Sequence, residues 1–216
     1  MEPMQPIVLQ PTDAILIVDV QNDFCPGGAL AVADGDAVIA PLNALAPRFA
    51  HVILTQDWHP AGHISFATSH PGHAVFERIS TANGEQVLWP DHCVQQTAGA
   101  ALHSALHISN AELVVRKGKQ LHVDSYSAFA DNDHSTTTGL ADHLRAEGVK
   151  RVFVAGLAYD FCVAATALDA HKEGFEVFVI EDASRAVNVE NSVARTNAIF
   201  AAENITRILA ADFAKH

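Results

Sequence analysis

Six short apolar segments recur along the chain, and longer helix-like stretches separate most of them. The segments are rich in Val, Ile, Leu or Phe and do not alternate with polar residues, which is typical of strands buried on both faces of a parallel sheet. They are 14–19 (AILIVD), 51–55 (HVILT), 112–116 (ELVVR), 151–155 (RVFVA), 176–180 (EVFVI) and 206–209 (TRIL). The pattern therefore predicts a mostly parallel sheet of six strands.

Four helix-like stretches lie between these segments, at 36–49, 139–147, 160–173 and 191–202. Asp160 is a predicted N-cap of the third helix, and Gly174 is a predicted C-cap at its end. Strands that alternate with helices are typical of a doubly wound, Rossmann-like α/β fold with helices on both faces of the sheet.

The segment from Asp57 to about Ser109 departs from this alternation and is rich in His, Pro and Gly. A long irregular loop in a compact domain is usually functional. The chain has no Pro/Gly/Ser-rich linker, repeat or low-complexity tract, so we expect residues 1–216 to form one domain.

Composition narrows the class of partner. The chain is 49% hydrophobic and 18% charged, as expected for a folded domain, and its net charge of −12 disfavours binding to nucleic acid. Its apolar runs have strand length, so we expect no membrane span. Three cysteines and the absence of a secretory pattern in the first residues predict a reducing, cytoplasmic location.

Reactive side chains follow the predicted strands. Asp19 ends the first, Lys117 follows the third, and Cys162 lies beyond the fourth, where the next helix begins. Ligands of open parallel sheets bind at the carboxyl ends of the strands, so we expect these groups to converge. A helix N-terminus and a nearby lysine favour the thiolate of a cysteine, which is its nucleophilic form, and Asp19 could exchange the proton as a general base.

Each of these residues also has an ordinary structural interpretation. Cys162 could be packed at a strand–helix junction, Asp19 could bond its own backbone, and Lys117 could be a solvated lysine. The predicted meeting of all three favours the catalytic interpretation.

A second group of side chains has the character of a metal site. Asp57 and His59 are two residues apart and point the same way in an extended chain, and His92 comes from the long loop. Two imidazoles and one carboxylate suit an open site for Zn, Fe or Mn, and His63 is a candidate fourth ligand. The alternative is a solvated, His-rich loop.

Aromatic residues stand next to these motifs, namely Phe24, Trp89 and Tyr126. Packing in the core is their default role, but a flat aromatic substrate would use them as stacking walls.

Six motifs together resemble the nicotinamidases of the isochorismatase-like cysteine hydrolase superfamily. They are DVQNDF at 19–24, DWHP at 57–60, WPDHC at 89–93, RKG at 116–118, DSYSAF at 124–129 and GLAYDFC at 156–162. The resemblance runs from about Ala14 to Asp182, and the joint presence of DWH and WPDHC is its most specific part.

The resemblance implies roles for particular residues. Asp19, Lys117 and Cys162 match the catalytic triad of the family. Further matches are the metal ligands Asp57, His59 and His92, the oxyanion-hole residues Ala158 and Cys162, a cis Leu157–Ala158 peptide, and the ring-binding walls Phe24 and Trp89. Tyr159 stands where the family pattern leads us to expect a small Thr, so it is a further candidate for shaping the pocket.

The implied reaction converts nicotinamide to nicotinate and ammonia through a thioester on Cys162. One divalent ion, Zn or Fe, with Mn as a further candidate, would orient the pyridine ring, and we expect pyrazinamide to be hydrolysed as well. Rival interpretations are a superfamily amidohydrolase for ureido or carbamoyl substrates, a metal-binding protein on an inactive scaffold, and a hydrolase that uses metal-activated water. A small homo-oligomer is also expected.

Overall fold

Six parallel strands form the central sheet of the computed structural model, which describes residues 6–214. Their order across the sheet is β5-β2-β1-β6-β7-β8. Their bounds are β1 Asp13–Val18, β2 His51–Asp57, β5 Leu113–Lys117, β6 Arg151–Leu157, β7 Glu176–Arg185 and β8 Thr206–Ile208. The six predicted strands are confirmed, and only β7 runs well past its predicted end.

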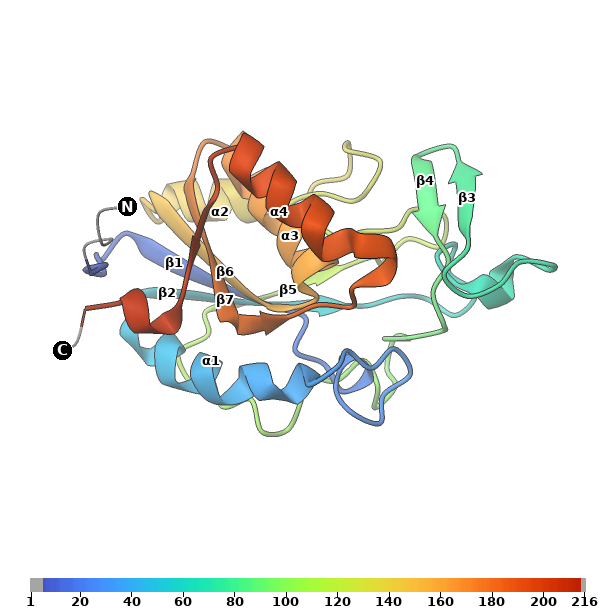
Figure 1. Ribbon diagram of the computed structural model, residues 1–216, viewed down its shortest axis with the longest axis horizontal. Helices are drawn as coiled ribbons and strands as arrows, with labels where there is room; N and C mark the ends of the chain where they lie inside the picture. Colours follow the sequence, from blue (N-terminus) through green and yellow to red (C-terminus); the bar gives the residue numbers. More distant parts are fainter. Residues whose placement is uncertain (1–5, 215–216) are drawn as a thin grey trace.

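Helices cover both faces of this sheet, as Figure 1 shows. They are α1 Ile39–Leu45, α2 Leu140–Ala146, α3 Ala164–Lys172 and α4 Ser192–Ala202. α1 packs on one face, where Leu42 and Leu45 are buried, and α2, α3 and α4 pack on the other with Leu144, Ala167 and Phe200. The doubly wound α/β class is therefore confirmed. No described helix is both long and apolar enough to cross a bilayer.

The first predicted helix, 36–49, is broken into three pieces. α1 is preceded by a 3-10 turn at Gly35–Val38 and followed by another at Ala46–Arg48. Pro47 has no N–H to continue the helical bonding, and its ring obstructs the preceding turn, so the α-helix ends at Leu45.

The start of the third helix also differs from the prediction. α3 begins at Ala164, after a π-type turn over Tyr159–Val163 that the Val163 N–H closes on the Ala158 carbonyl at 3.1 Å. Asp160 is not an N-cap, because its carboxylate bonds a distant loop instead. The C-cap is Glu173, one residue before the predicted Gly174, which follows it with φ at 89° and donates its N–H to the His171 carbonyl.

The long segment after β2 contains a hairpin that the hydrophobic pattern did not reveal. β3 Arg78–Thr81 and β4 Gly84–Val87 pair antiparallel and project beyond one end of the sheet (Figure 1). Their side chains are mostly exposed, so alternation is weak, and the available signal was the Asn83-Gly84 turn.

The strand order reverses between β1 and β6, which are neighbours in the sheet although far apart in the chain. Chains leave such a switch point toward opposite faces and open a crevice at the carboxyl ends of the strands. Asp19 follows β1 and Cys162 follows β6, so the topology alone brings them to this crevice.

Gly156 sets the spacing of β1 and β6 just below the crevice. It has φ at +120°, and a Cβ there would lie 2.2 Å from the Val18 carbonyl oxygen. We expect Gly156→Ala to lower the free energy of unfolding by about 3 kcal/mol or more, since backbone strain and a backbone clash add. Gly148→Ala is the matched control, because Gly148 has φ at +75° with open space around it. Denaturant titration should show a loss of only about 1–2 kcal/mol for the control. Equal losses in the two variants would contradict a role for strand spacing.

Candidate active site

Lys117 lies fully buried at the centre of a cluster drawn from four strand ends. Its ammonium lies 2.8 Å from Asp19 Oδ2, pairs with Asp57 Oδ1, and donates to the Ser125 carbonyl at 3.1 Å and to Cys162 Sγ at 3.3 Å. The structure thus brings Asp19, Lys117 and Cys162 together, as the sequence predicts. It also joins them directly to the predicted metal ligands.

Asp19 is aimed by its own backbone and by Thr55. Its φ of 47° turns the chain as it leaves β1. The Thr55 hydroxyl donates to Asp19 Oδ1 at 2.5 Å and accepts from the Asp19 N–H at 3.0 Å. Asp19 Oδ2 is buried without a well-aligned hydrogen-bond donor, so its contact with Lys117 is mainly electrostatic. That oxygen is therefore free to accept a proton.

The charges in the cluster set its resting protonation state. Burial raises the pKa of Asp19, and the negative charge of nearby Asp57 raises it further. The positive charge of Lys117 lowers this pKa, but by too little to cancel the other two effects. Burial favours the neutral form of Lys117. The negative charges of Asp19 and Asp57 have the larger effect and hold the pKa of Lys117 well above its usual value.

Burial also raises the pKa of the Cys162 thiol well above its usual value, and Lys117 only partly offsets this effect. Lys117 favours the thiolate of Cys162, as expected, but burial, reinforced by the charges of Asp19 and Asp57, has the larger effect on its pKa. A base must remove the thiol proton. Asp19, with its raised pKa and free oxygen, has the required properties.

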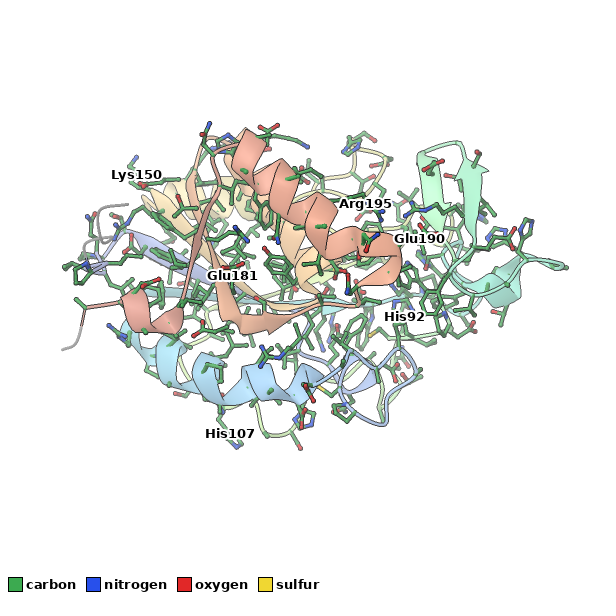
Figure 2. All side chains as sticks on the ribbon, viewed as in Figure 1. His92, His107, Lys150, Glu181, Glu190 and Arg195 are labelled. Carbon is green, nitrogen blue, oxygen red and sulfur yellow. The ribbon has the colours of Figure 1, made fainter. Side chains whose placement is uncertain are left out.

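Asp57, His59 and His92 form the predicted three-ligand cluster. The two Nε2 atoms lie 3.6 and 3.7 Å from Asp57 Oδ2, too long for hydrogen bonds but close to the roughly 3.4 Å between two ligands of one tetrahedral zinc. All three donor atoms lie within 4.8 Å of one another. Figure 2 shows His92 beyond the carboxyl-terminal end of the sheet, on the side of the hairpin.

The other nitrogens of the two imidazoles orient them for such binding. His59 Nδ1 donates to the Gly118 carbonyl at 3.0 Å, and His92 Nδ1 donates to the Pro90 carbonyl at 2.8 Å. Both Nε2 lone pairs are then directed at the position of an ion. Gly118 is required here, since a Cβ would lie 2.4 Å from the His59 ring. The residues fit a divalent metal.

Asp57 is held by both its backbone and its charge. Gln21, fully buried, donates to the Asp57 carbonyl and accepts from the Asp57 N–H, both at 2.8 Å. Burial opposes ionisation of Asp57, but Lys117 and the imidazoles overcome it and lower the pKa of the carboxyl well below its usual value. Gln21 was not identified from the sequence, although it lies within the DVQNDF motif.

His63 is placed next to this cluster but is already engaged. Its ring stacks on His59 at 4.2 Å, its Nδ1 accepts from the Ser65 hydroxyl at 2.8 Å, and its Nε2 donates to the Val123 carbonyl at 3.2 Å. Burial, with the nearby His59, lowers the pKa of His63 to about 4. Neither ring nitrogen is free for the ion that the three-ligand cluster would hold.

The turn before Cys162 presents backbone donors to the same space. The Leu157–Ala158 peptide is cis, as expected. Within the described residues the Ala158 N–H makes no hydrogen bond. Ala158 and Cys162 both line a small cavity of about 20 Å³, which holds little more than one water. A ring-sized ligand must therefore displace part of its wall.

Aromatic side chains form most of that wall. Phe24, Trp89 and Tyr126 line the cavity as predicted, and the Trp89 Nε1–H donates to the Tyr126 hydroxyl at 3.0 Å. Leu30, Phe161 and Val187 also line it and were not identified from the sequence, because an apolar residue in a loop carries no distinctive signal.

Tyr159 does not line the cavity, and this prediction is corrected. Its ring packs edge-on against Phe200 of α4, and its hydroxyl donates to Asn197 Oδ1 at 2.6 Å. The residue follows the cis peptide, where the chain turns its side chain into the helical layer. The substitution of a larger residue there leaves the cavity wall unchanged.

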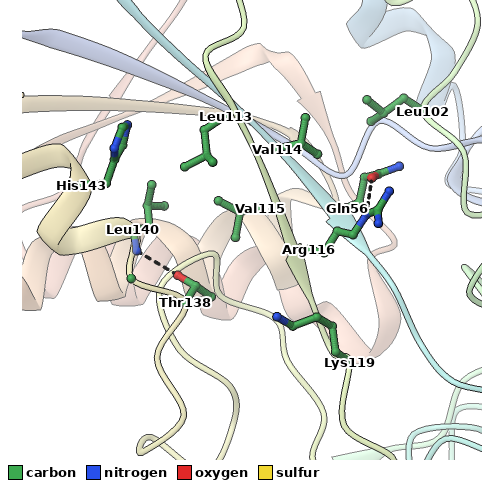
Figure 3. A pocket seen from close by; sticks show the side chains of 11 residues that line it. Gln56, Leu102, Leu113, Val114, Val115, Arg116, Lys119, Thr138, Leu140 and His143 are labelled. Carbon is green, nitrogen blue, oxygen red and sulfur yellow. Dashed lines mark hydrogen bonds between the residues drawn. The ribbon is translucent and has the colours of Figure 1, made fainter.

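A far more spacious cavity, about 710 Å³, lies elsewhere. It follows the open edge of β5 and is lined by Val114, Arg116 and Leu140 among others (Figure 3). It contains none of the clustered residues, so its size does not make it the reactive site.

Comparison with known proteins supports one family. The Isochorismatase domain model matches residues 13–208. The chain is 47% identical to a nicotinamidase of Acinetobacter baylyi over 90% of this chain and 91% of that protein. It is 46% identical to a nicotinamidase of Escherichia coli over 83% and 86%.

Solved structures give the same result. A nicotinamidase/pyrazinamidase of Acinetobacter baumanii superposes with a TM-score of 0.93 and 49% identity, covering 94% of this chain and 98% of that one. PnC1 of L. infantum in complex with nicotinate has a TM-score of 0.86 and 38% identity, covering 99% and 100%. A Pyrococcus horikoshii pyrazinamidase in complex with zinc has a TM-score of 0.76 and 35% identity, covering 92% and 99%.

Removing the buried ammonium of Lys117 should show how much it contributes to the stability of the fold. We expect Lys117→Met, studied in chelator-treated protein, to lower the free energy of unfolding by about 3–5 kcal/mol, because two carboxylates are left buried and unneutralised. Lys117→Met with Asp57→Asn should recover part of the loss. Lys150→Met, which alters an exposed lysine, is the control and should change stability by less than about 0.5 kcal/mol in denaturant titration. A loss in Lys117→Met no larger than in the control would show that the cluster is not ionised as described.

Proposed function

The chain belongs to the isochorismatase family, and we propose that it hydrolyses nicotinamide to nicotinate and ammonia. The observation that carries this proposal is the position of Lys117, which joins the Asp19–Cys162 pair to the Asp57–His59–His92 cluster beneath a cavity with aromatic walls. A reactive thiol and a ring-binding site then lie side by side. The bound nicotinate of the L. infantum relative has the chemistry of the expected product.

Asp19 begins the reaction by accepting the Cys162 thiol proton on Oδ2. Lys117 remains charged beside both groups and stabilises the thiolate as it forms. The sulfur attacks the carboxamide carbon, and the C=O π electrons move to oxygen. The N–H groups of Ala158 and Cys162 would stabilise this oxyanion.

Collapse of the tetrahedral intermediate breaks the C–N bond. Protonated Asp19 gives its proton to the leaving nitrogen, which departs as ammonia. A water then attacks the thioester carbonyl while Asp19 takes one of its protons. The C–S bond breaks, Cys162 regains its proton from Asp19, and nicotinic acid leaves and releases its remaining proton to solvent to become nicotinate. Each proton accepted by Asp19 is thus returned.

A divalent ion held by Asp57, His59 and His92 would supply a Lewis-acid contact for the ring nitrogen of the substrate. We propose Zn or Fe for this site, with Mn as a further candidate. Phe24, Trp89 and Tyr126 would hold the ring edges and faces. Pyrazinamide, which has the same ring size and a nitrogen in the same relation to the carboxamide, should also be hydrolysed. We also propose that the protein is cytoplasmic and that it forms a small homo-oligomer.

Loss of the nucleophile should abolish turnover. We expect Cys162→Ala to release ammonia from nicotinamide at least about 10⁴-fold more slowly than wild type, since no thioester can form. Cys25→Ala removes another buried thiol and should retain activity within about threefold. Turnover that survives in Cys162→Ala would instead favour attack by metal-activated water. A wild-type protein that ignores nicotinamide but cleaves ureido compounds would refute the proposed substrate.

Metal stoichiometry separates the true ligands from His63. We expect about one equivalent of metal per chain in wild type and in His63→Gln, and much less in His92→Gln, by elemental analysis after dialysis against trace metal. The two variants replace buried imidazoles in the same loop region, so they are matched. If His63→Gln lost its metal as fully as His92→Gln, His63 would be a ligand after rearrangement.

A further inference from the structure

The loop that closes the outer side of the cavity is residues 186–191, between β7 and α4, and is called the roof loop here. Val187 of this loop lines the cavity, as do Ala158, Phe161 and Cys162 at the nucleophile turn. Three of its residues, Asn188, Glu190 and Asn191, have φ of 57°, 50° and 60°. A short 3-10 turn over Val189–Asn191 is the loop's only regular structure, and Glu190 inside it has non-helical φ and ψ, so the position of the loop depends on the contacts that anchor it.

The inner end of the roof loop is anchored by Asp160. The Asp160 carboxylate accepts from the Val187 N–H at 3.0 Å, from the Asn188 N–H at 2.7 Å and from the Ser192 hydroxyl at 2.5 Å. Asp160 is only 7% exposed and lies two residues before Cys162. One side chain therefore ties the turn that carries the nucleophile to the loop that closes the cavity.

The outer end of the loop has a weaker attachment. Arg78 of the β3–β4 hairpin donates to the Glu190 carboxylate at 3.2 Å, and Arg195 donates to the Glu190 carbonyl, but all three side chains are exposed to solvent. Glu190 and Arg195 lie near the start of α4 on the hairpin side of the molecule (Figure 2). Exposed ion pairs contribute little, whereas buried charge-assisted hydrogen bonds are strong, so Asp160 dominates the position of the loop.

The walls of the cavity differ in how readily they can yield. Phe24, Trp89 and Ala158 are at most 5% exposed and pack into the core, whereas Tyr126, Phe161 and Val187 are partly exposed. A ring needs a wider cavity, and of these three residues only Val187 lies in the roof loop and would shift with it. The distance that it can move sets the largest ring that fits.

We propose that Asp160 is a positioning residue that fixes the roof loop relative to Cys162 and so determines which ring substituents the site accepts. The inference rests on the proposed hydrolysis of nicotinamide. Asp160 does not touch the reacting atoms. It acts through Val187, whose side chain limits the space above the ring.

The test compares nicotinamide with 5-methylnicotinamide. One added methyl in a tight apolar site commonly costs tenfold or more in kcat/KM, so wild type should prefer nicotinamide by at least about tenfold. In Asp160→Asn we expect this preference to fall about tenfold. The KM for nicotinamide should rise about tenfold, and kcat should stay within about threefold. Val187→Ala keeps every anchor and should reduce the preference in the same way.

The matched control is Asp13→Asn. Asp13 is also a buried carboxylate that accepts hydrogen bonds from a backbone N–H and from a side chain, Arg151, but it lies at the opposite end of the sheet. This variant should lower the melting temperature and leave the substrate preference unchanged. The inference is overturned if Asp160→Asn keeps the wild-type preference, or if its kcat falls equally for both amides, as a purely structural role would give.

Two further measurements keep the inference separable from the proposed function. If Asp160→Asn does not fold, Val187→Ala and Ser192→Ala decide, and an unchanged preference in both overturns the inference. Wild-type turnover of nicotinamide tests the proposed function by itself. Hydrogen exchange needs no substrate: the Asn188 amide should lose protection in Asp160→Asn but not in Asp13→Asn, and retained protection would overturn the anchoring.

Discussion

A buried ammonium between two carboxylates is the interaction on which the site depends. Lys117 is fully buried and contacts Asp19, Asp57 and Cys162 at once. Desolvating three charged groups is costly, and the cost is offset only while all of them stay paired. Lys117, with the imidazoles, lowers the pKa of Asp57, whereas burial, reinforced by Asp57, raises the pKa of Asp19 against the same lysine. Two carboxylates beside one cation thus differ in basicity because their other neighbours differ.

The fold supplies this arrangement because each charged group ends or follows a different parallel strand. Asp57 and Lys117 are register partners on β2 and β5, while Asp19 and Cys162 leave β1 and β6 on the two sides of the switch point. The strands fix the backbone, and local bonds from Thr55 and Gln21 fix the carboxylates. A side chain at a strand end is therefore held by the sheet rather than by a mobile loop, as precise chemistry requires.

The sequence predicted the features that come from recurring hydrophobic runs and from charged or reactive side chains. Continuous apolar runs predicted all six strands of the sheet, and strand ends predicted the meeting of Asp19, Lys117 and Cys162. Interactions set by tertiary context could not be predicted. The resting protonation of Cys162 depends on how many carboxylates share its burial, and the side-chain direction of Tyr159 depends on the turn after Ala158. Leu30 and Val187 have no local signature that distinguishes a cavity wall from ordinary packing.

Asp160 has the sequence pattern of a helix N-cap, but its carboxylate accepts hydrogen bonds from a distant loop instead. An acidic residue just before a helix is a common N-cap, yet the π-type turn directs this carboxylate away from the helix and toward the roof loop. The turn therefore borders both the cavity and the roof loop. Phe161 and Cys162 of the turn line the cavity, and its one acidic side chain bonds the loop that closes the cavity. The turn carries both the nucleophile and the carboxylate that anchors the roof loop, so the position of the loop is fixed relative to Cys162. Asp160 does not touch the reacting atoms, so ring selection can change while kcat changes little.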